Sequence, residues 1–231
     1  MGQRWRNFFM EQESLKSNFR VIKVKMVAVE LLQAGIDELG LKLSNKQIQQ
    51  LFQYVKLLLK WNRVYSLTAI RTIDKIITHH ILDGLSLIKY LGDAANIVDV
   101  GSGMGVPAII LAISCPKIRV TAIDCSAKKT AFLRQVVIEL RLKNCHIVTS
   151  LVEKYVPAIK FDLAVSRAFA SAKLFLNLTR HLLNEHASWI LMKSHGVLDE
   201  VDEIKEYKYE IIPTCVPFIA ETRCLLKISA I

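Results

Sequence analysis

A glycine-rich turn between two apolar runs constrains this chain more than any other feature. Ile97–Val100 predicts a buried strand, and Ala108–Ile113 predicts a helix that starts a few residues later. Gly101, Gly103 and Gly105 lie between them, and three glycines so close together cost backbone entropy that a plain turn would not need. Such a turn lets the backbone approach a ligand closely and points the N-terminus of the new helix at it.

The residues around this turn favour one class of ligand. The same strand–turn–helix layout binds dinucleotides and S-adenosylmethionine, so it predicts an architecture and not a reaction. Asp99, at the end of the strand, suits a ligand that carries an ammonium group, and it would repel a pyrophosphate. The third glycine of the dinucleotide pattern would fall at Val106. Both details favour S-adenosylmethionine as the cofactor, and a tight turn without a ligand is the alternative.

Length and composition limit the classes of protein that fit. A chain of 231 residues with 52% hydrophobic residues is long enough for one large domain, or for one domain and a small appendage. The longest uncharged apolar run, Val106–Cys115, is too short to span a bilayer, which takes roughly 20 residues. The five cysteines lie far apart without a Cys-x-x-Cys pair. We therefore expect reduced thiols in a cytoplasmic protein, with no secretory signal, membrane contact or metal site.

The positive charge of the chain predicts a polyanionic partner. The formal net charge is +10, which favours nucleic acid first and an anionic membrane second. Residues 1–25 contribute +4 of this charge (six Lys and Arg against Glu11 and Glu13) and show no clean helical or strand period. This basic extension is either an arm that orders on nucleic acid or a segment upstream of a functional start at Met26. We favour the second interpretation.

Residues 26–95 predict a helical N-terminal part. A first helix is expected at Val27–Leu39, and Ser44 with Gln47 forms a capping-box signature for a second, long helix. Trp61–Arg71 is expected to be a connector, and Ile73–Leu91 a further amphipathic helix. The apolar face of the long helix consists of Ile48, Leu51, Phe52, Val55, Leu58 and Leu59.

His80 and Asp83 lie three residues apart in the last of these stretches, so they share a helical face. The expected arrangement is a hydrogen-bonded pair. A metal site is not expected, because no third ligand lies nearby.

Residues 96–231 predict an α/β domain. Strands alternate with helices, which is typical of a doubly wound, mostly parallel sheet covered on both faces. A helix is expected after Val120–Asp124, with Ala131, Phe132, Val136 and Leu140 facing the sheet, and further helices at Leu174–Leu183 and Val197–Glu206. Seven strands are expected, at Ile97–Val100, Val120–Asp124, Cys145–Thr149, Phe161–Ser166, Trp189–Lys193, Tyr209–Ile212 and Cys224–Ile228.

Ligands of such sheets bind beyond the carboxyl ends of the strands. Asp124 lies 23 residues after Gly101, near the offset of roughly 20 residues at which an acid binds a ribose hydroxyl. The alternative role is a helix N-cap, but Ser126 can cap instead. Glu153 either binds adenine or is merely solvated. Ser166–Phe169 places an arginine beside an aromatic residue at a strand end.

The arginine and the aromatic residue in Ser166–Phe169 could also have purely structural roles. Arg167 could form a structural salt bridge, and Phe169 could pack between the strand and the next helix.

Several short motifs in this order resemble those of the bacterial 16S ribosomal RNA guanine-N7 methyltransferase G family, also called the glucose-inhibited division protein B family. The resemblance runs from about Leu31 to Lys227. Its markers are Trp61-Asn62, Leu67-Thr68-Ala69-Ile70, His80 with Leu82-Asp83, Asp99-Val100-Gly101-Ser102-Gly103, Phe132-Leu133-Arg134, Phe161-Asp162, Ser166-Arg167-Ala168-Phe169-Ala170 and Met192-Lys193.

The resemblance implies a sheet of the class I S-adenosylmethionine-dependent methyltransferase type. It also implies methylation of N7 of a guanine in a loop of the small-subunit decoding region, with 16S rRNA or the small ribosomal subunit as the partner. Nothing in the sequence suggests a dedicated dimer helix, so we expect a monomer. His79 and Cys224 stand where the family often has Arg and His, so no role is transferred to them. The implied cofactor-binding residues are Asp99, Gly101, Gly103, Val106, Asp124, Val152, Glu153 and Arg167.

Guanine N7 carries a free lone pair and no proton, so this reaction needs no general base. The enzyme's task is to position the two reactants. Arg167, Phe169 and His80 are the candidates for that task. Two other functions stay open on the sequence alone. One is an NAD(P)-dependent oxidoreductase that uses the same glycine turn, and the other is a non-catalytic rRNA-binding or assembly factor.

Overall fold

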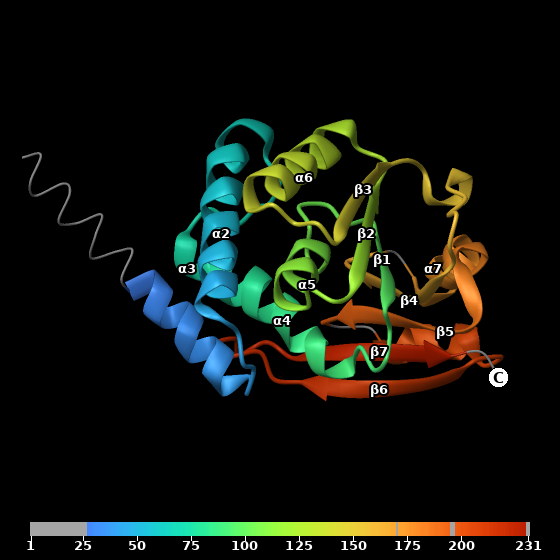
Figure 1. The fold of residues 1–231 in the computed structure, drawn as a ribbon. Helices are drawn as coiled ribbons and strands as arrows, with labels where there is room; N and C mark the ends of the chain where they lie inside the picture. The colour runs from blue at the N-terminus through green and yellow to red at the C-terminus, as the bar shows by residue number, and fades with distance from the viewer. Residues whose placement is uncertain (1–26, 170, 195–196, 230–231) are drawn as a thin grey trace, which may run out of the picture.

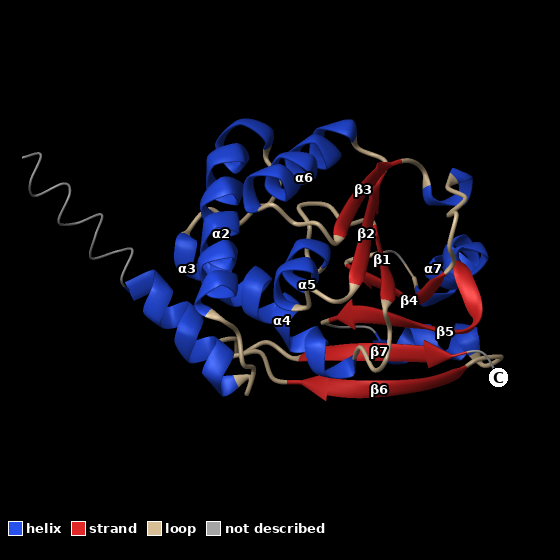
Figure 2. Ribbon diagram, viewed as in Figure 1, coloured by secondary structure: helices blue, strands red, loops and turns tan. Residues whose placement is uncertain are grey.

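A twisted sheet of seven strands organises the described part of the chain (Figure 2). The computed structural model describes residues 27–169, 171–194 and 197–229, so the basic extension 1–25 and the proposed start at Met26 lie outside the described residues. The strands are β1 Asn96–Val100, β2 Arg119–Asp124, β3 Cys145–Thr149, β4 Phe161–Arg167, β5 Leu183–Lys193, β6 Lys208–Thr214 and β7 Arg223–Ser229.

The order of the strands in the sheet is β3-β2-β1-β4-β5-β7-β6. The first five strands in this order are parallel, and β7 is antiparallel to both of its neighbours. The predicted class, a mostly parallel seven-stranded sheet, is therefore confirmed. The chain leaves β1 toward β2 on one side and returns to β4 on the other. Ligands of doubly wound sheets bind at such a reversal, beyond the carboxyl ends of the strands.

Helices cover both faces of the sheet (Figure 1). Successive residues of each buried strand point to opposite faces, so the sheet contributes to two apolar clusters. One cluster joins Ile97 of β1 to α2 Asn45–Tyr65, α5 Ala108–Ser114 and α6 Ala127–Leu140. The other joins Val98 of β1 to α7 Ala172–Thr179 and the segment that contains α8 Val197–Val201 and η5 Asp202–Ile204.

The N-terminal helices begin with residues 27–38, as predicted, and turn at Gly40. The Ser44 side chain accepts from the Gln47 N–H and the Gln47 side chain accepts from the Ser44 N–H, which confirms the capping box. The helix α2 continues through Tyr65, however, so the prediction of a connector from Trp61 onward is wrong for its first turn. The Trp61 ring packs against Phe132 of α6, with 5.5 Å between ring centroids, and this contact keeps the turn helical.

The stretch predicted as a helix from Ile73 to Leu91 is helical as far as Tyr90, but its hydrogen-bonding pattern changes three times. It consists of α3 Ile73–Ile76, the π-helical turn η1 Ile77–Leu82, α4 Asp83–Ser86 and the 3-10 turn η2 Leu87–Tyr90. Apolar periodicity predicted a helix here but not its type. The π turn carries His79 and His80, and π turns are frequent at functional sites.

Three further expectations need correction. Ala131 is exposed, and Leu133 is buried with Phe132, Val136 and Leu140 on the face of α6 that covers the sheet. The helix expected to reach Leu183 ends at Thr179 and is followed by the 3-10 turn η4 Arg180–Leu182, because Leu183 already pairs with β4 as the start of β5. The helix expected to reach Glu206 ends as the 3-10 turn η5 at Ile204.

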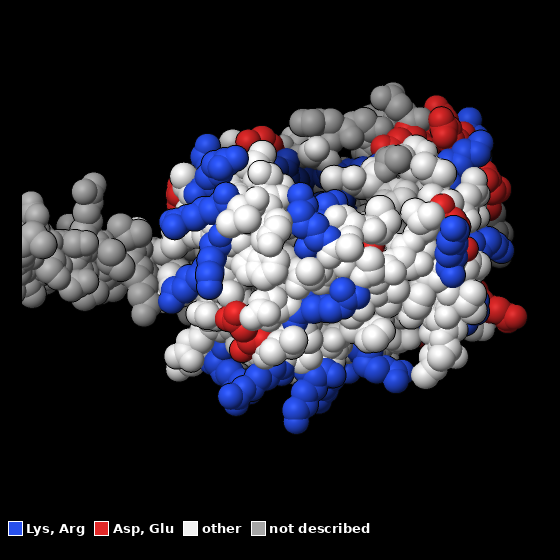
Figure 3. All heavy atoms as spheres, turned by 90° about the horizontal axis from the view of Figure 1, so that it is seen from above, with Lys and Arg blue, Asp and Glu red and all other residues white. Residues whose placement is uncertain are grey.

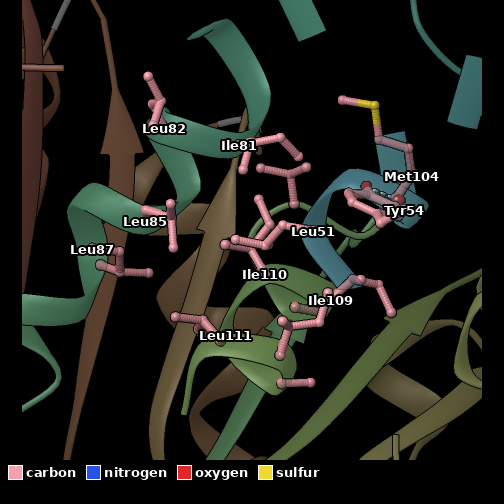
Figure 4. Close-up of a cluster of buried hydrophobic side chains, with 14 of the residues drawn as sticks. Leu51, Tyr54, Ile81, Leu82, Leu85, Leu87, Met104, Ile109, Ile110 and Leu111 are labelled. Carbon is pink, nitrogen blue, oxygen red and sulfur yellow. Dashed lines mark hydrogen bonds between the residues drawn. The ribbon is translucent and has the colours of Figure 1, made fainter. Parts of the chain in front are cut away.

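The N-terminal helices and the glycine turn share one core (Figure 4). Leu51 of α2 lies beside Ile110 of α5, Ile81 lies on the other side of Leu51, and Tyr54 lies beside Met104 of the glycine turn. Tyr54 is fully buried, and its hydroxyl donates to the Met104 carbonyl oxygen at 2.7 Å. This bond ties α2 directly to the glycine turn.

The third glycine of the turn is required by packing as well as by backbone conformation. Gly105 has a φ of +96°, and a Cβ there would lie 2.5 Å from Ile109 and 2.7 Å from Leu133. We predict that Gly105→Ala lowers the free energy of unfolding by about 2–4 kcal/mol, because left-handed strain and overpacking add. Urea unfolding measures this change.

Gly92→Ala is the matched control. Gly92 has a φ of +58°, and a Cβ added there would meet nothing within 4 Å, so its substitution should cost about 1 kcal/mol. Equal losses in the two variants would contradict the packing account.

Candidate functional site

The glycine turn leaves β1 and leans over the end of β2. The N–H groups of Gly101 and Ser102 both donate to the Ile123 carbonyl oxygen, at 2.8 and 3.0 Å. Gly101 has a φ of +72° and is exposed, and a Cβ on Gly103 would meet only the Gly101 carbonyl oxygen, at 3.8 Å. The turn therefore presents bare backbone at the carboxyl edge of the sheet, where a ligand can come close.

Asp99 holds the far end of the turn. It is fully buried, and its Oδ2 accepts from the Ala108 N–H at the start of α5, at 3.0 Å. Its Oδ1 has no hydrogen-bond partner among the described residues. Burial raises the pKa of the Asp99 carboxyl to about 7, against the opposing effect of the Ala108 hydrogen bond. One oxygen of Asp99 thus shapes the turn, and the other is available as an acceptor.

Asp124 holds the middle of the turn. Its Oδ2 accepts from the Gly103 N–H at 2.9 Å, and its Oδ1 accepts from the Ser126 N–H at 2.8 Å. Ser126, not Asp124, is the N-cap of α6, since its side chain accepts from the Lys129 N–H. The Lys129 ammonium lies 3.5 Å from Asp124. The N-cap alternative for Asp124 is therefore wrong, and this carboxylate faces the glycine turn.

The other predicted cofactor residues lie around the same edge or just beneath it. Val106 is buried under the turn. Val152 and Glu153 belong to η3 Val152–Lys154, the short turn after β3, where Val152 is buried and Glu153 is exposed. Arg167 ends β4, the neighbour of β1 on the other side.

Arg167 is the centre of a polar cluster that joins β4 to the N-terminal helices. Its Nη1 donates to Asp83 Oδ2 at 3.1 Å and to the His79 carbonyl oxygen at 3.0 Å, and it lies 3.2 Å from His80 Nδ1. Arg223 of β7 approaches the other oxygen of Asp83 at 3.8 Å. The structural salt bridge considered for Arg167 is therefore present.

His80 and Asp83 lie on one face, as predicted, but the expected pair between them is wrong, because each contacts Arg167 instead. His80 Nε2 is 3.0 Å from Thr68 Oγ1. Burial, together with the neighbouring Arg167 charge, lowers the pKa of His80 to about 3, so the imidazole is neutral at physiological pH. Burial also raises the pKa of Asp83, although the Arg167 charge opposes this.

A cavity of about 380 Å³ opens beside this cluster, at the ends of β4, β5 and β6 and the start of β7. The Phe169 ring lies on its wall, and it is the nearest group that a Cβ on Gly101 would meet, at 3.4 Å. Phe169 also packs edge-on against Phe175, with 5.1 Å between centroids. On the opposite side, Lys193 Nζ donates to both carboxylate oxygens of Glu200, at 2.8 and 2.9 Å.

Sequence reasoning missed several residues of this edge. Tyr54 follows Leu51 at helical spacing, so the apolar period of α2 could have included it. Lys193 was recognised only as part of a motif, and its partner Glu200 was not considered. Arg223 carries no local signal, because its approach to Asp83 depends on the pairing of β7 with β5.

Two kinds of feature are not found in the part of the chain that the structure describes. It contains no group of three or more His, Cys, Asp or Glu side chains placed to hold a metal ion. None of its helices is both long enough and apolar enough to cross a membrane.

Comparison with known proteins identifies close relatives. The family model described as rRNA small subunit methyltransferase G matches residues 47–223. Proteins named ribosomal RNA small subunit methyltransferase G from Chromobacterium violaceum and Laribacter hongkongensis are 40% and 43% identical to this chain. The alignments cover 85% and 87% of this chain, and 95% and 97% of the relatives.

Solved structures share the fold at low sequence identity. A SAM-dependent methyltransferase from Aquifex aeolicus is 15% identical, with a TM-score of 0.53 over 68% of this chain and 93% of its own. A magnesium protoporphyrin IX methyltransferase from Synechocystis, solved with bound SAM, is 16% identical, with a TM-score of 0.55 over 82% of this chain and 99% of its own. The predicted methyltransferase fold class is confirmed.

The raised pKa of Asp99 predicts a pH dependence of stability. The carboxyl titrates near 3.8 in the unfolded chain and near 7 in the folded one, so the folded state retains its proton over this window. The protonated Asp99 carboxyl makes its full contribution to the free energy of unfolding below about pH 4. This contribution is lost as the pH rises to about 7, and the loss is on the order of 4 kcal/mol.

Asp99→Asn keeps an acceptor for the Ala108 N–H and does not titrate. Urea unfolding of the protein and of this variant between pH 4 and 8 should give a stability difference that moves in favour of the variant as pH rises. A difference that stays constant across this range would contradict the assignment.

Proposed function

Because this chain belongs to the rRNA small subunit methyltransferase G family, we propose that it transfers the methyl group of S-adenosylmethionine to N7 of a guanine in 16S rRNA. The observation that carries the proposal is the family match over residues 47–223, which contains the glycine turn, Asp124 and Arg167. We further propose that the enzyme acts in the cytoplasm as a monomer, on 16S rRNA or the small ribosomal subunit.

The residues at the edge of the sheet fit S-adenosylmethionine. The left-handed glycines expose backbone, and Asp99 Oδ1 is a buried acceptor that lacks a donor among the described residues. Asp99, Asp124 and Glu153 place carboxylates at the ends of β1, β2 and β3, which suits a cation and disfavours a pyrophosphate. Together with the family membership, this charge pattern argues against the oxidoreductase alternative.

Each of these residues has a role in the proposed cofactor site. Gly101, Gly103 and Val106 shape the surface against which the cofactor lies. Asp124 accepts from the ribose hydroxyls, and Asp99 accepts from the ammonium group. The remaining contacts are Val152 and Glu153 with adenine, and Arg167 with the cofactor carboxylate.

S-adenosylmethionine supplies an electrophilic methyl group, and the chain supplies position. Guanine N7 attacks with its own lone pair, so no residue has to remove a proton. The cavity beside Phe169 gives the target base a site that the Phe169 ring connects to the glycine turn, since this ring lines the cavity and lies 3.4 Å from a Cβ built on Gly101. Holding both reactants in line removes much of the entropic barrier to a bimolecular reaction.

Arg167 acts in this scheme as a fixed positive charge. Asp83 and the His79 carbonyl hold its guanidinium from one side. His80 is a positioning residue, because it links Arg167 to Thr68 and its low pKa keeps it neutral. A cation beside a sulfonium does not stabilise the transition state, so we assign Arg167 to binding and alignment.

Mapping of methylated bases tests the function directly. Small ribosomal subunits that lack N7-methylguanine are incubated with the protein and S-adenosylmethionine, and 16S rRNA is then cleaved chemically at N7-methylguanine. We predict one new site, in a loop of the decoding region. Failure to modify any guanine, in subunits and in naked rRNA alike, would contradict the proposal.

Gly101→Val should abolish this methyl transfer, because a branched side chain is strained at a φ of +72° and covers the exposed backbone. Gly92→Val introduces comparable strain in open space and should retain activity. Retained biological function without methyl transfer in Gly101→Val would support the non-catalytic binding factor instead.

The absence of a required proton transfer predicts a level pH profile. At saturating cofactor and rRNA, kcat should change less than about twofold between roughly pH 8 and 9, which lies above the pKa of Asp99, about 7. His80 does not titrate in that range, since its pKa is about 3. Steady-state rates in a constant-ionic-strength buffer measure this, and a tenfold rise per pH unit would instead reveal a general base.

A further inference from the structure

A second, larger hollow lies at the opposite edge of the sheet from the glycine turn. Its volume is about 700 Å³. It is bounded by the start of α2, the ends of α5 and α6, and the start of β2. We call it the basic groove. Its lining residues are Ser44, Lys46, Gln47, Gln50, Ala112, Ile113, Pro116, Lys117, Arg119, Arg141, Leu142, Lys143 and Asn144.

The groove carries cations without carboxylates. Its lining includes Lys46, Lys117, Arg119, Arg141 and Lys143 and no Asp or Glu, and all five cations are exposed. None of the ion pairs found between described residues involves them. The groove therefore has a strongly positive potential that its own lining does not neutralise.

Helix dipoles alone do not account for this charge. Cations are favourable near the C-termini of α5 and α6, but neutral amides already satisfy the carbonyl groups there. Gln47 donates to the Ile113 and Ser114 carbonyl oxygens, Gln50 to Leu140, and Asn144 to Ala112. The floor of the groove is thus a hydrogen-bonded amide network, and the cations stand around it facing solvent.

The groove is well separated from the proposed methyl-transfer site. Arg119 starts β2 and Asp124 ends it, and a rise of about 3.3 Å per residue places the two about 16 Å apart along the strand. A ligand that reaches both edges must therefore be a large, folded polyanion. Figure 3 shows that Lys and Arg are also spread over the surface seen from above, mainly on the α2 side and along the lower margin.

A neighbouring hollow of about 410 Å³ extends the groove. It shares Arg119, Lys143 and Asn144 with the groove, and the partly exposed Tyr155 and the exposed Ile159 also line it. Aromatic and apolar walls beside cations suit a nucleotide, whose base can stack while its phosphate pairs. This combination of a concave cationic groove with an aromatic hollow favours RNA over a flat anionic membrane.

We propose that the basic groove binds the sugar–phosphate backbone of the substrate RNA at a segment remote from the target guanine. The inference rests on the proposed function, since it takes 16S rRNA as the substrate. Contacts with phosphates fix the orientation of the RNA without reading its sequence. Binding at two opposite edges of the sheet selects a folded RNA that reaches both, and it aligns the target loop with the cavity beside Phe169.

The test compares two double variants of equal charge change. Arg141→Gln/Lys143→Gln removes two cations of the groove and leaves Asn144 and its capping bonds in place. Lys205→Gln/Lys208→Gln removes two exposed cations at or just before β6, which is at the other end of the strand order from β3. The probe is a 16S rRNA transcript, and its affinity is measured at several salt concentrations.

The groove variant should bind the transcript roughly tenfold more weakly at physiological salt, and the slope of log affinity against log salt should fall by about 1.5 for two lost phosphate contacts. The control variant should bind like the unchanged protein. In methylation assays on small subunits, the groove variant should show a raised KM, an unchanged kcat and unchanged affinity for S-adenosylmethionine.

The inference is wrong if the groove variant and the unchanged protein bind the transcript with equal affinity, or if both double variants lose the same amount of affinity. It is also wrong if the groove variant binds RNA normally but no longer binds anionic phospholipid vesicles that the unchanged protein binds. If the unchanged protein methylates no rRNA, the proposed function fails instead, and the affinity comparison still decides whether the groove binds RNA.

Discussion

Two buried carboxylates hold the glycine turn in a backbone conformation that side chains disfavour. Asp99 accepts from the Ala108 N–H on one side of the turn, and Asp124 accepts from the Gly103 N–H at its centre. Each bond fixes the backbone of the turn, and each requires that an ionisable side chain be buried. Burial is the reason that the pKa of Asp99 is raised. The turn is thereby shaped before any ligand binds, so little ordering remains to oppose binding.

The second constraint is the salt bridge between Arg167 and Asp83. It crosses from the end of β4 to the helical N-terminal part, and Arg223 and His80 join it. A partly buried ion pair of this kind contributes little net stability, but removal of one partner leaves an uncompensated charge. We infer that this salt bridge serves to position the N-terminal helices, because it fixes them relative to the edge of the sheet where the cavity and the glycine turn lie.

Local patterns predicted much of this structure from the sequence. Glycine spacing, the capping box at Ser44 and the alternation of strands with helices are each decided by neighbouring residues, and each was found. The predictions failed where distant contacts decide. Trp61 extends α2 because Phe132 packs against it, and Arg223 reaches Asp83 only through strand pairing. The π-helical turn at His79 and His80 leaves no signature in apolar periodicity. The basic groove likewise gathers residues from four separate elements, so the sequence predicted a polyanionic partner but not this site.

The most direct test of the account is a crystal structure with S-adenosylhomocysteine, the demethylated product of the cofactor. We expect this molecule to lie across Gly101 and Gly103, with its ribose hydroxyls donating to Asp124 and its sulfur facing the cavity beside Phe169. A structure in which it binds elsewhere, or in which soaked NAD occupies the glycine turn in its place, would contradict the central claim.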